Sequence, residues 1–199
     1  MKINRNGLPI GPKILKVSLP KNLKRVWPDL RYYQSASFDE RKKASMNLSP
    51  LLHDFKVKKH ERILDIGAFN NVIVETIQSR GFYNAVGIDV NPEILESPFG
   101  MKINFRDLRL NEKYRVLHFS YILSHFGDAT PCQGKKPSLQ FLANKIYLHL
   151  LPEGYLIFRD DSPNIPIFLH SLRSIGFKKR ISRTDPETKT MRGFIFQKP

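Results

Sequence analysis

The sequence predicts an α/β protein: a doubly wound, mostly parallel seven-stranded sheet with a C-terminal antiparallel hairpin. Short apolar runs of strand length alternate with longer amphipathic runs along the 199-residue chain. Such alternation is typical of a parallel sheet that helices cover on both faces. The last two apolar runs, 177–181 and 193–197, flank a polar stretch and indicate the hairpin. The length suits one domain with a buried core.

The first half of the chain contains three predicted strands. A capping box, Ser37-Phe-Asp-Glu40, predicts a helix that runs to about Leu48. Glycine at position 81 suits the end of a second helix, and Asn91-Pro92 suits the start of a third. The expected elements are strand 62–66, a helix from Asn70 or Asn71 to about Arg80, strand 85–90, a short helix from Asn91, and strand 102–105.

The second half continues the alternation. Residues 127–137 are rich in turn formers and indicate a loop, after which Ser138 is the expected cap of a long apolar helix. Pro152-Glu-Gly154 predicts the end of that helix, and Gly176 the end of the next. The expected elements are strand 116–120, a helix from 139 to about 151, strand 155–158, a helix over 165–175, and the closing hairpin.

The net charge is +15, and the basic residues gather in segments 1–62 and 173–199. This excess favours a polyanionic partner such as RNA, DNA or anionic lipid, although a solvated basic face that aids solubility explains it equally well. Residues 1–36 form a proline-interrupted basic arm that does not resemble a transit peptide. We therefore expect an arm, 1–36, and one folded domain, 37–199; a chain cut from a longer protein stays an alternative.

The composition also bears on location. A single cysteine, Cys132, excludes an internal disulfide and suits a reducing compartment. No apolar run approaches the roughly 18 residues that cross a bilayer. We expect an intracellular, cytoplasmic protein, with the nucleus or an organelle as alternatives, and the sequence does not predict an oligomeric state.

The most informative segment is Glu61–Asn71. It predicts a short strand that ends at Asp65-x-Gly67 and turns sharply into a helix. A turn of this kind forms a cofactor crevice at the carboxyl ends of parallel strands. The next strand ends in Asp89, roughly twenty residues later, which is the usual spacing of a ribose-binding carboxylate. Together the two acids predict a nucleoside-containing cofactor.

Six segments in this order resemble class I S-adenosylmethionine-dependent methyltransferases, from about Ser37 to the C-terminus. They are Ile63-Leu-Asp-Ile-Gly67, Gly87-Ile-Asp89, Phe105-Arg-Asp107, Tyr114–Phe126, Leu150-Leu-Pro-Glu-Gly-Tyr-Leu-Ile-Phe158 and the closing hairpin. The resemblance implies S-adenosyl-L-methionine as cofactor and a methyltransferase whose acceptor is unidentified.

The resemblance also implies a role for each matching residue. A diol and an exocyclic amine are donors, so carboxylates at strand ends recognise them well. By position, Asp65 and the backbone at Gly67 would bind the methionine part of the cofactor, and Asp89 would accept from both ribose hydroxyls. Val90 would contact the adenine face, Asp107 would accept from the adenine amino group, and Leu108 would contact the ring through its backbone. Ser120 and Tyr121 would line the opening where the methyl group is transferred.

Two departures from the family pattern stand at expected cofactor-binding positions. Phe69 and Asn71 occupy places that usually hold glycine. Asparagine tolerates left-handed backbone, whereas phenylalanine does so poorly, and its ring would either swing away or partly fill the cofactor space. Arg115 stands where an acid is common. One interpretation is a weakened but functional pocket; the other is an inactive domain that binds RNA or an acidic partner through its basic ends.

Catalytic signatures are sparse. His125 is the candidate general base, with a hydrogen-bonding role at a helix start as the alternative, and His118 is interpreted as structural. Cys132 lies in Thr130-Pro-Cys-Gln133, which resembles a cytosine-C5 nucleophile motif but follows its strand at too great a distance. The pair Asp160-Asp161 is interpreted as a solvated loop end rather than a metal site, and no metal is predicted.

Overall fold

The computed structural model describes residues 48–199 except 121, 124–125, 127–137 and 185–191. Its centre is a seven-stranded sheet in the order β3-β2-β1-β4-β5-β7-β6. The β1–β2, β1–β4, β2–β3 and β4–β5 pairs are parallel, whereas β7 is antiparallel to β5 and β6. This confirms the predicted fold class. The strands are β1 Ile63–Ile66, β2 Ala85–Asp89, β3 Gly100–Lys102, β4 Tyr114–Ser120, β5 Leu150–Asp160, β6 Lys178–Thr184 and β7 Arg192–Gln197.

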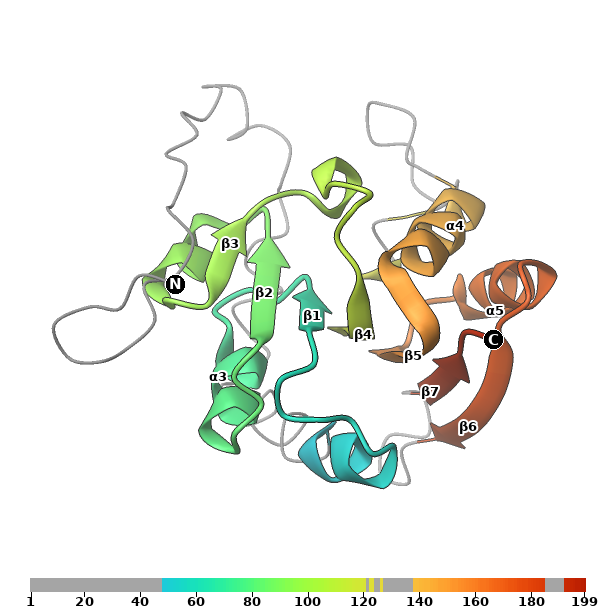
Figure 1. The fold of residues 1–199 in the computed structure, drawn as a ribbon. Helices are drawn as coiled ribbons and strands as arrows, with labels where there is room; N and C mark the ends of the chain where they lie inside the picture. Colours follow the sequence, from blue (N-terminus) through green and yellow to red (C-terminus); the bar gives the residue numbers. More distant parts are fainter. Residues whose placement is uncertain (1–47, 121, 124–125, 127–137, 185–191) are drawn as a thin grey trace, which may run out of the picture.

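Helices cover both faces of the sheet (Figure 1). On one face lie α3, Val72–Ser79, and a helical segment over 48–54, and their apolar side chains pack on β1, β2, β4, β5 and β7. On the other face lie α4, Leu139–His149, and α5, Ile165–Ser174, over a larger core rich in phenylalanine. Stacked rings such as Phe119 and Phe158, 4.8 Å apart, bridge neighbouring strands within that core.

Two predicted elements were misplaced. The third strand is Gly100–Lys102 and not 102–105, because Asn104 caps a 3₁₀ turn, η3, over Phe105–Asp107 by accepting from the amide of Arg106. The helix expected to reach 151 ends at His149, since Leu150 already pairs with Tyr114 at the start of β5. Pro152-Glu-Gly154 is therefore a bulge inside β5 rather than the boundary of a helix.

The helix predicted to end at about Leu48 is also wrong at that end, because residues 48–54 are helical and include Pro50. The other elements match their predictions more closely. Asn91 caps the short 3₁₀ helix η2, Pro92–Glu96, and Ser138 caps α4. The expected arm 1–36, the start of the predicted helix 37–48 and the loop 127–137 lie outside the described residues. Among the helices of the described part, none is long and apolar enough to cross a bilayer.

The parallel strands give the sheet two distinct ends. We call the end with Ile63, Ala85 and Tyr114 the amino end, and the end with Ile66, Asp89 and Ser120 the carboxyl end. Because parallel strands finish together, residues that follow them gather at the carboxyl end.

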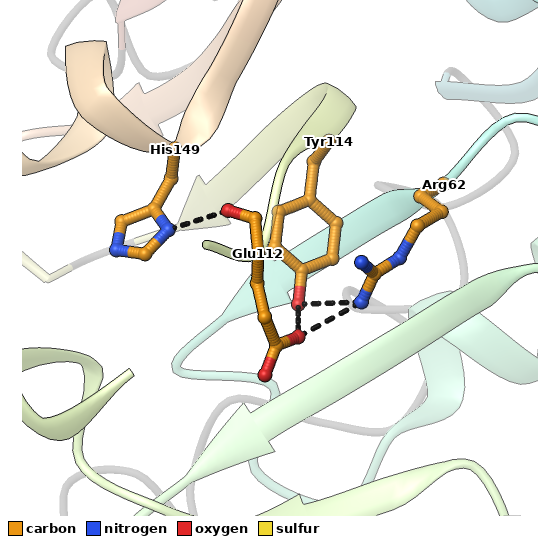
Figure 2. Close-up of polar contacts among 4 residues, drawn as sticks. All are labelled: Arg62, Glu112, Tyr114 and His149. Atoms are coloured by element: carbon orange, nitrogen blue, oxygen red, sulfur yellow. Dashed lines mark hydrogen bonds and ion pairs between the residues drawn. The ribbon is translucent and has the colours of Figure 1, made fainter. Parts of the chain in front are cut away.

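Four polar side chains hold the amino end together (Figure 2). The Tyr114 hydroxyl donates to Glu112 Oε2 at 2.8 Å, and Arg62 Nη2 donates to the same oxygen at 2.8 Å. The guanidinium of Arg62 also lies 4.4 Å from the centre of the Tyr114 ring. The buried His149 contributes a bond from Nδ1 to the Glu112 carbonyl at 2.8 Å. The network ties the starts of β1 and β4 to the end of α4.

Candidate functional site

The loop between β1 and α3 has the backbone conformation that glycine favours. Gly67 has φ 73°, and the non-glycine residues Phe69 and Asn71 also have positive φ, 51° and 66°. Each such residue costs about 1 kcal/mol relative to ordinary backbone, so the surrounding contacts must hold the loop in place. The backbone turn predicted here therefore forms without glycine at positions 69 and 71.

Asn71 is one of the contacts that hold this loop. Its side chain is fully buried, donates from Nδ2 to Ser97 Oγ at 2.9 Å, and lies directly over Gly87 of β2. A Cβ at Gly87 would lie 1.9 Å from Asn71 Oδ1, so only glycine fits there. The Nδ2 group of Asn71 is thus used inside the fold, whereas its buried Oδ1 has no hydrogen-bond partner among the described residues.

Asp89 is the second contact that holds the loop. Its Oδ2 accepts from the amide of Phe69 at 2.8 Å, and its Oδ1 accepts from the amide of Asn91 at 2.8 Å. Burial raises the pKa of this carboxyl, the amides of Asn91, Phe69 and Val90 oppose that rise, and the charge of Asp65 adds to it. Each oxygen keeps one further acceptor position, so the half-buried carboxylate is fixed and still able to bind donors.

Val90 follows Asp89 with its side chain 37% exposed. It is an apolar surface directly beside the carboxylate, as the predicted contact with an adenine face requires. The side-chain positions of Asp89 and Val90 therefore suit the two halves of a nucleoside, a diol and a flat ring.

Asp65 lies one strand away and is almost completely buried, at 2% exposure. Its Oδ1 is 2.7 Å from Nδ1 of His118, the residue opposite it on β4. Its Oδ2 is buried and has no hydrogen-bond partner among the described residues. A buried acceptor without a donor is uncommon and indicates a place for a bound donor. His118, interpreted as structural from sequence, is the partner that fixes this carboxylate.

Asp107 and Leu108 lie on and just after η3, the turn that connects β3 to the approach to β4. Asp107 is exposed, Leu108 is buried, and the Leu108 amide makes only a long bond, 3.4 Å, to the Phe105 carbonyl. Lys145 of α4 reaches under this turn and donates to the carbonyls of Arg106 and Leu108. Burial lowers the pKa of Lys145, and the charge of Asp107 opposes that shift.

The segment after β4 meets the loop after β1. A Cβ at Gly67 would lie 2.7 Å from Ile122 Cγ2, so the chain following Ser120 packs against Gly67. Ser120 is half-buried, and its Oγ has no partner among the described residues. Tyr121, His125 and Cys132, which the sequence placed at or near this mouth, lie outside the described residues.

Asp160 and Asn164 hold the segment that follows β4 through hydrogen bonds to its backbone. Asp160 Oδ2 accepts from the Leu123 amide at 3.0 Å, and Asn164 Nδ2 donates to the carbonyls of Leu123 and Phe126 at 3.1 and 2.9 Å. Burial raises the pKa of Asp160, against the amides of Leu123 and Ser162. Asp160, 1% exposed, is therefore not the solvated loop end that the sequence suggested, whereas Asp161 is exposed.

Two further observations concern residues singled out from sequence. Among the described residues, no group of three or more His, Cys, Asp or Glu side chains could hold a metal ion. Arg115, which stands where an acid was expected, pairs with Glu61 at 3.7 Å near the start of β4. It lies at the amino end of the sheet, whereas Asp89 lies at the carboxyl end.

The structure thus brings some predicted site residues together. Asp65, Gly67, the backbone at Phe69, and Asp89 with Val90 lie at neighbouring strand ends, with Ser120 beside them on β4. Asp107 and Leu108 lie on and after the turn η3, which packs against Lys145 of α4. Sequence reasoning missed Lys145, because its contact with η3 depends on how α4 packs. For His118 there was one signal, a polar residue inside an apolar strand.

Comparison with known proteins places this arrangement in context. No family model matches the chain, and no curated protein matches it in sequence. Solved structures do match. The N-methyltransferase NodS from Bradyrhizobium japonicum WM9, in complex with S-adenosyl-L-homocysteine, is 13% identical with a TM-score of 0.61, over 88% of this chain and 95% of that one.

Two other structures agree. The ribosomal protein L11 methylase from Lactobacillus delbrueckii subsp. bulgaricus is 14% identical, with a TM-score of 0.59 over 80% of each chain. An S-adenosylmethionine-dependent methyltransferase from Mesorhizobium loti is 12% identical, with a TM-score of 0.57 over 75% of this chain and 96% of that one. At such identities the likeness establishes the fold, which is that of class I methyltransferases.

Proposed function

We propose that this chain is an S-adenosylmethionine-dependent methyltransferase whose methyl acceptor is not yet defined. The observation that carries the proposal is the carboxylate of Asp89, held at the end of β2 by the amides of Phe69 and Asn91. A fixed carboxylate with acceptor capacity left over, beside an exposed apolar side chain, is suited to a ribose diol and its base.

The other residues of the site fit the rest of that cofactor. The free Oδ2 of Asp65 would accept from the ammonium of the methionine part. The left-handed loop from Gly67 to Asn71 brings backbone rather than side-chain atoms to the same place. Asp107 would accept from the adenine amino group, with η3 held in position by Lys145.

The protein's share of the reaction is placement. S-adenosylmethionine supplies a methyl group activated by a sulfonium. Asp89 and Asp65 orient the two ends of the cofactor, and the segment after Ser120 frames the acceptor side. Asp160 and Asn164 fix that segment through Leu123. Placement of two reactants contributes most of the rate in such displacements. Removal of an acceptor proton is the role predicted for His125.

The test is binding of S-adenosylhomocysteine measured by calorimetry. We expect the intact chain to bind it and not to bind ATP, which offers ribose and adenine but no amino-acid part. Asp89→Ala should weaken binding at least tenfold, because two charge-assisted hydrogen bonds are lost. Asp161→Ala removes the same charge from an exposed position nearby and should bind as the parent does. A folded sample that gives no heat of binding at millimolar S-adenosylhomocysteine would refute the proposal.

The alternative is a domain of this fold that no longer transfers methyl groups and binds RNA or an acidic partner through its basic termini. The exposed run Lys178-Lys-Arg180 on β6 favours it. The same calorimetry separates the two, because the alternative predicts no cofactor binding.

A further inference from the structure

Basic residues crowd the amino end of the sheet, opposite the candidate cofactor site. They come from the loop before β1, the turn between α3 and β2, the start of β4 and the base of the β6–β7 hairpin. The basic residues are Lys56, Lys58, Lys59, Arg62, Arg80, Lys113, Arg115, Lys178, Lys179, Arg180 and Lys198, and they outnumber the acidic residues there, Asp54, Glu61, Glu112 and Glu153.

Most of this charge is not neutralised within the described part of the molecule. Glu61 pairs with Arg115 and Glu112 pairs with Arg62, so these acids are already engaged. Eight exposed basic residues form no ion pair with any described residue: Lys56, Lys58, Lys59, Arg80, Lys113, Lys178, Lys179 and Arg180. Net positive charge held at one end of a sheet attracts a polyanion.

A chain of contacts makes the basic groups one continuous surface. Arg180 Nε donates to Gln197 Oε1 at 2.9 Å, and Gln197 Nε2 donates to the Tyr155 hydroxyl at 3.2 Å. The Tyr155 ring stacks on Phe55 with 4.5 Å between ring centres, at the start of the lysine-bearing loop. The hairpin base and the loop before β1 are thus adjacent.

The same loop adjoins the turn between α3 and β2. Asn84 Nδ2 donates to the His60 carbonyl at 2.6 Å, and the Lys59 side chain lies against Gly81. Between these contacts Tyr83 is 61% exposed, the most exposed of the large apolar side chains in the described residues. An uncovered aromatic ring therefore stands beside Lys59 and Arg80.

We propose that this surface binds single-stranded nucleic acid, with the lysines on phosphates and Tyr83 stacked on a base. Basic side chains around an exposed aromatic ring are the usual means of binding single strands without sequence preference. A nucleic acid offers a phosphate and a flat base in every unit, whereas an anionic membrane or an acidic peptide offers no such ring repeatedly. The surface is separate from Asp65 and Asp89, so the proposal does not depend on cofactor binding.

Fluorescence anisotropy with a labelled oligouridine of about twenty nucleotides tests the location of the surface. At about 50 mM salt we expect binding that weakens steeply as salt rises. Lys58→Glu with Lys59→Glu should reduce affinity about tenfold. Lys102→Glu with Arg106→Glu, an exposed residue on η3, makes the same change of charge away from the amino end and should reduce it less than about threefold. Equal losses in both double variants, or no binding by the parent, would overturn the proposal.

Substitution of Tyr83 tests the stacking. Tyr83→Ala should weaken oligouridine binding about tenfold, and Tyr83→Phe should retain it because the ring remains. Circular dichroism melting confirms that each variant is folded. An unchanged affinity in a folded Tyr83→Ala variant overturns the stacking. A second outcome would overturn the proposal as a whole: tighter binding to vesicles containing phosphatidylserine than to the oligouridine, with the same loss of vesicle affinity in Lys58→Glu/Lys59→Glu. The surface would then be a membrane contact.

Discussion

The two ends of the sheet differ in how their carboxyl groups are bonded, although His149 Nε2 at the amino end also has no partner among the described residues. At the amino end, Glu112 and Tyr114 bond to each other and to Arg62 (Figure 2). At the carboxyl end, Asp65 Oδ2 and Ser120 Oγ have no partner among the described residues, and the loop after β1 is in left-handed conformation. Groups that satisfy one another stabilise a fold, whereas unfilled and strained groups mark a place for a ligand.

The hydrogen bonds of Glu112 give the amino end its stabilising role. Burial alone would raise the pKa of Glu112, but bonds from Tyr114 and Arg62 outweigh burial and lower it. Burial and the bond to Glu112 raise the pKa of Tyr114. Both groups therefore stay in one ionisation state near neutral pH. The carboxyl end differs, since burial raises the pKa of both Asp89 and Asp160.

The largest expected effect is on the Asp65–His118 pair. His118→Leu leaves a buried carboxylate without its described partner, and such a loss costs about 3 to 5 kcal/mol. Urea unfolding of this variant and of His170→Leu, an exposed histidine on α5, gives the comparison. If the two substitutions cost the same, the pair does not stabilise the carboxyl end.

A smaller loss of stability is expected from Gly87→Ala. The new methyl group would collide with Asn71 Oδ1 and with Ala68 Cβ, so β2 and the loop must move apart at a cost of about 2 to 3 kcal/mol. Gly193→Ala on β7 meets nothing within 4 Å and should change stability little. Thermal unfolding of both variants checks this, and equal melting temperatures would show that the loop is loosely packed.

Two substitutions compare the ends directly, because one should change stability and the other should change ligand affinity. Tyr114→Phe removes the hydroxyl bonded to Glu112 and should lower the free energy of unfolding by about 1 kcal/mol, with S-adenosylhomocysteine affinity unchanged. Asp89→Asn should instead weaken S-adenosylhomocysteine affinity about tenfold. Paired urea unfolding and calorimetry measure both quantities. A Tyr114→Phe variant that binds more weakly would break the division of roles.

The smallest effect concerns pH. Burial lowers the pKa of His149 below 6.5, so below that pH the unfolded chain takes up more protons and stability falls as pH falls. His149→Asn keeps an N–H for the Glu112 carbonyl but does not titrate. We expect the parent to lose stability relative to this variant as the pH falls from 7.5 to 5.5. If urea unfolding shows the same change in stability for the parent and for His149→Asn between the two pH values, His149 is not the source of the pH dependence.

Much of the fold could be predicted, because alternating apolar periodicity records which residues face the core. The sequence did not show where β3 ends or that β5 contains a bulge. Ile103 and Phe105 look like strand residues, yet Asn104 caps a 3₁₀ turn there. Leu150 is drawn into the sheet by pairing with Tyr114, which is distant in sequence.

The site was predictable only in part. Acids at strand ends lie near one another because parallel strands finish together, which local sequence can indicate. Their partners depend on register and helix packing, so His118 opposite Asp65 and Lys145 beneath η3 emerged only from the structure. The chemical roles of all the proposed site residues toward a cofactor stay predictions: Asp65, Gly67, Phe69, Asn71, Asp89, Val90, Asp107, Leu108, Ser120, Tyr121 and His125.

One of the two edge strands of the sheet, β6, has no strand beyond it among the described residues, and this affects how the protein behaves in concentrated solution. An uncovered strand is a template on which a second molecule can add its own strand and begin aggregation. Here the register shifts between Lys179 and Ile181, and three cationic residues in a row start the strand. Like charges would repel an approaching copy, and the irregular backbone would offer it a poor match. Neutralising these cations should therefore make the protein self-associate, even where its fold is unchanged.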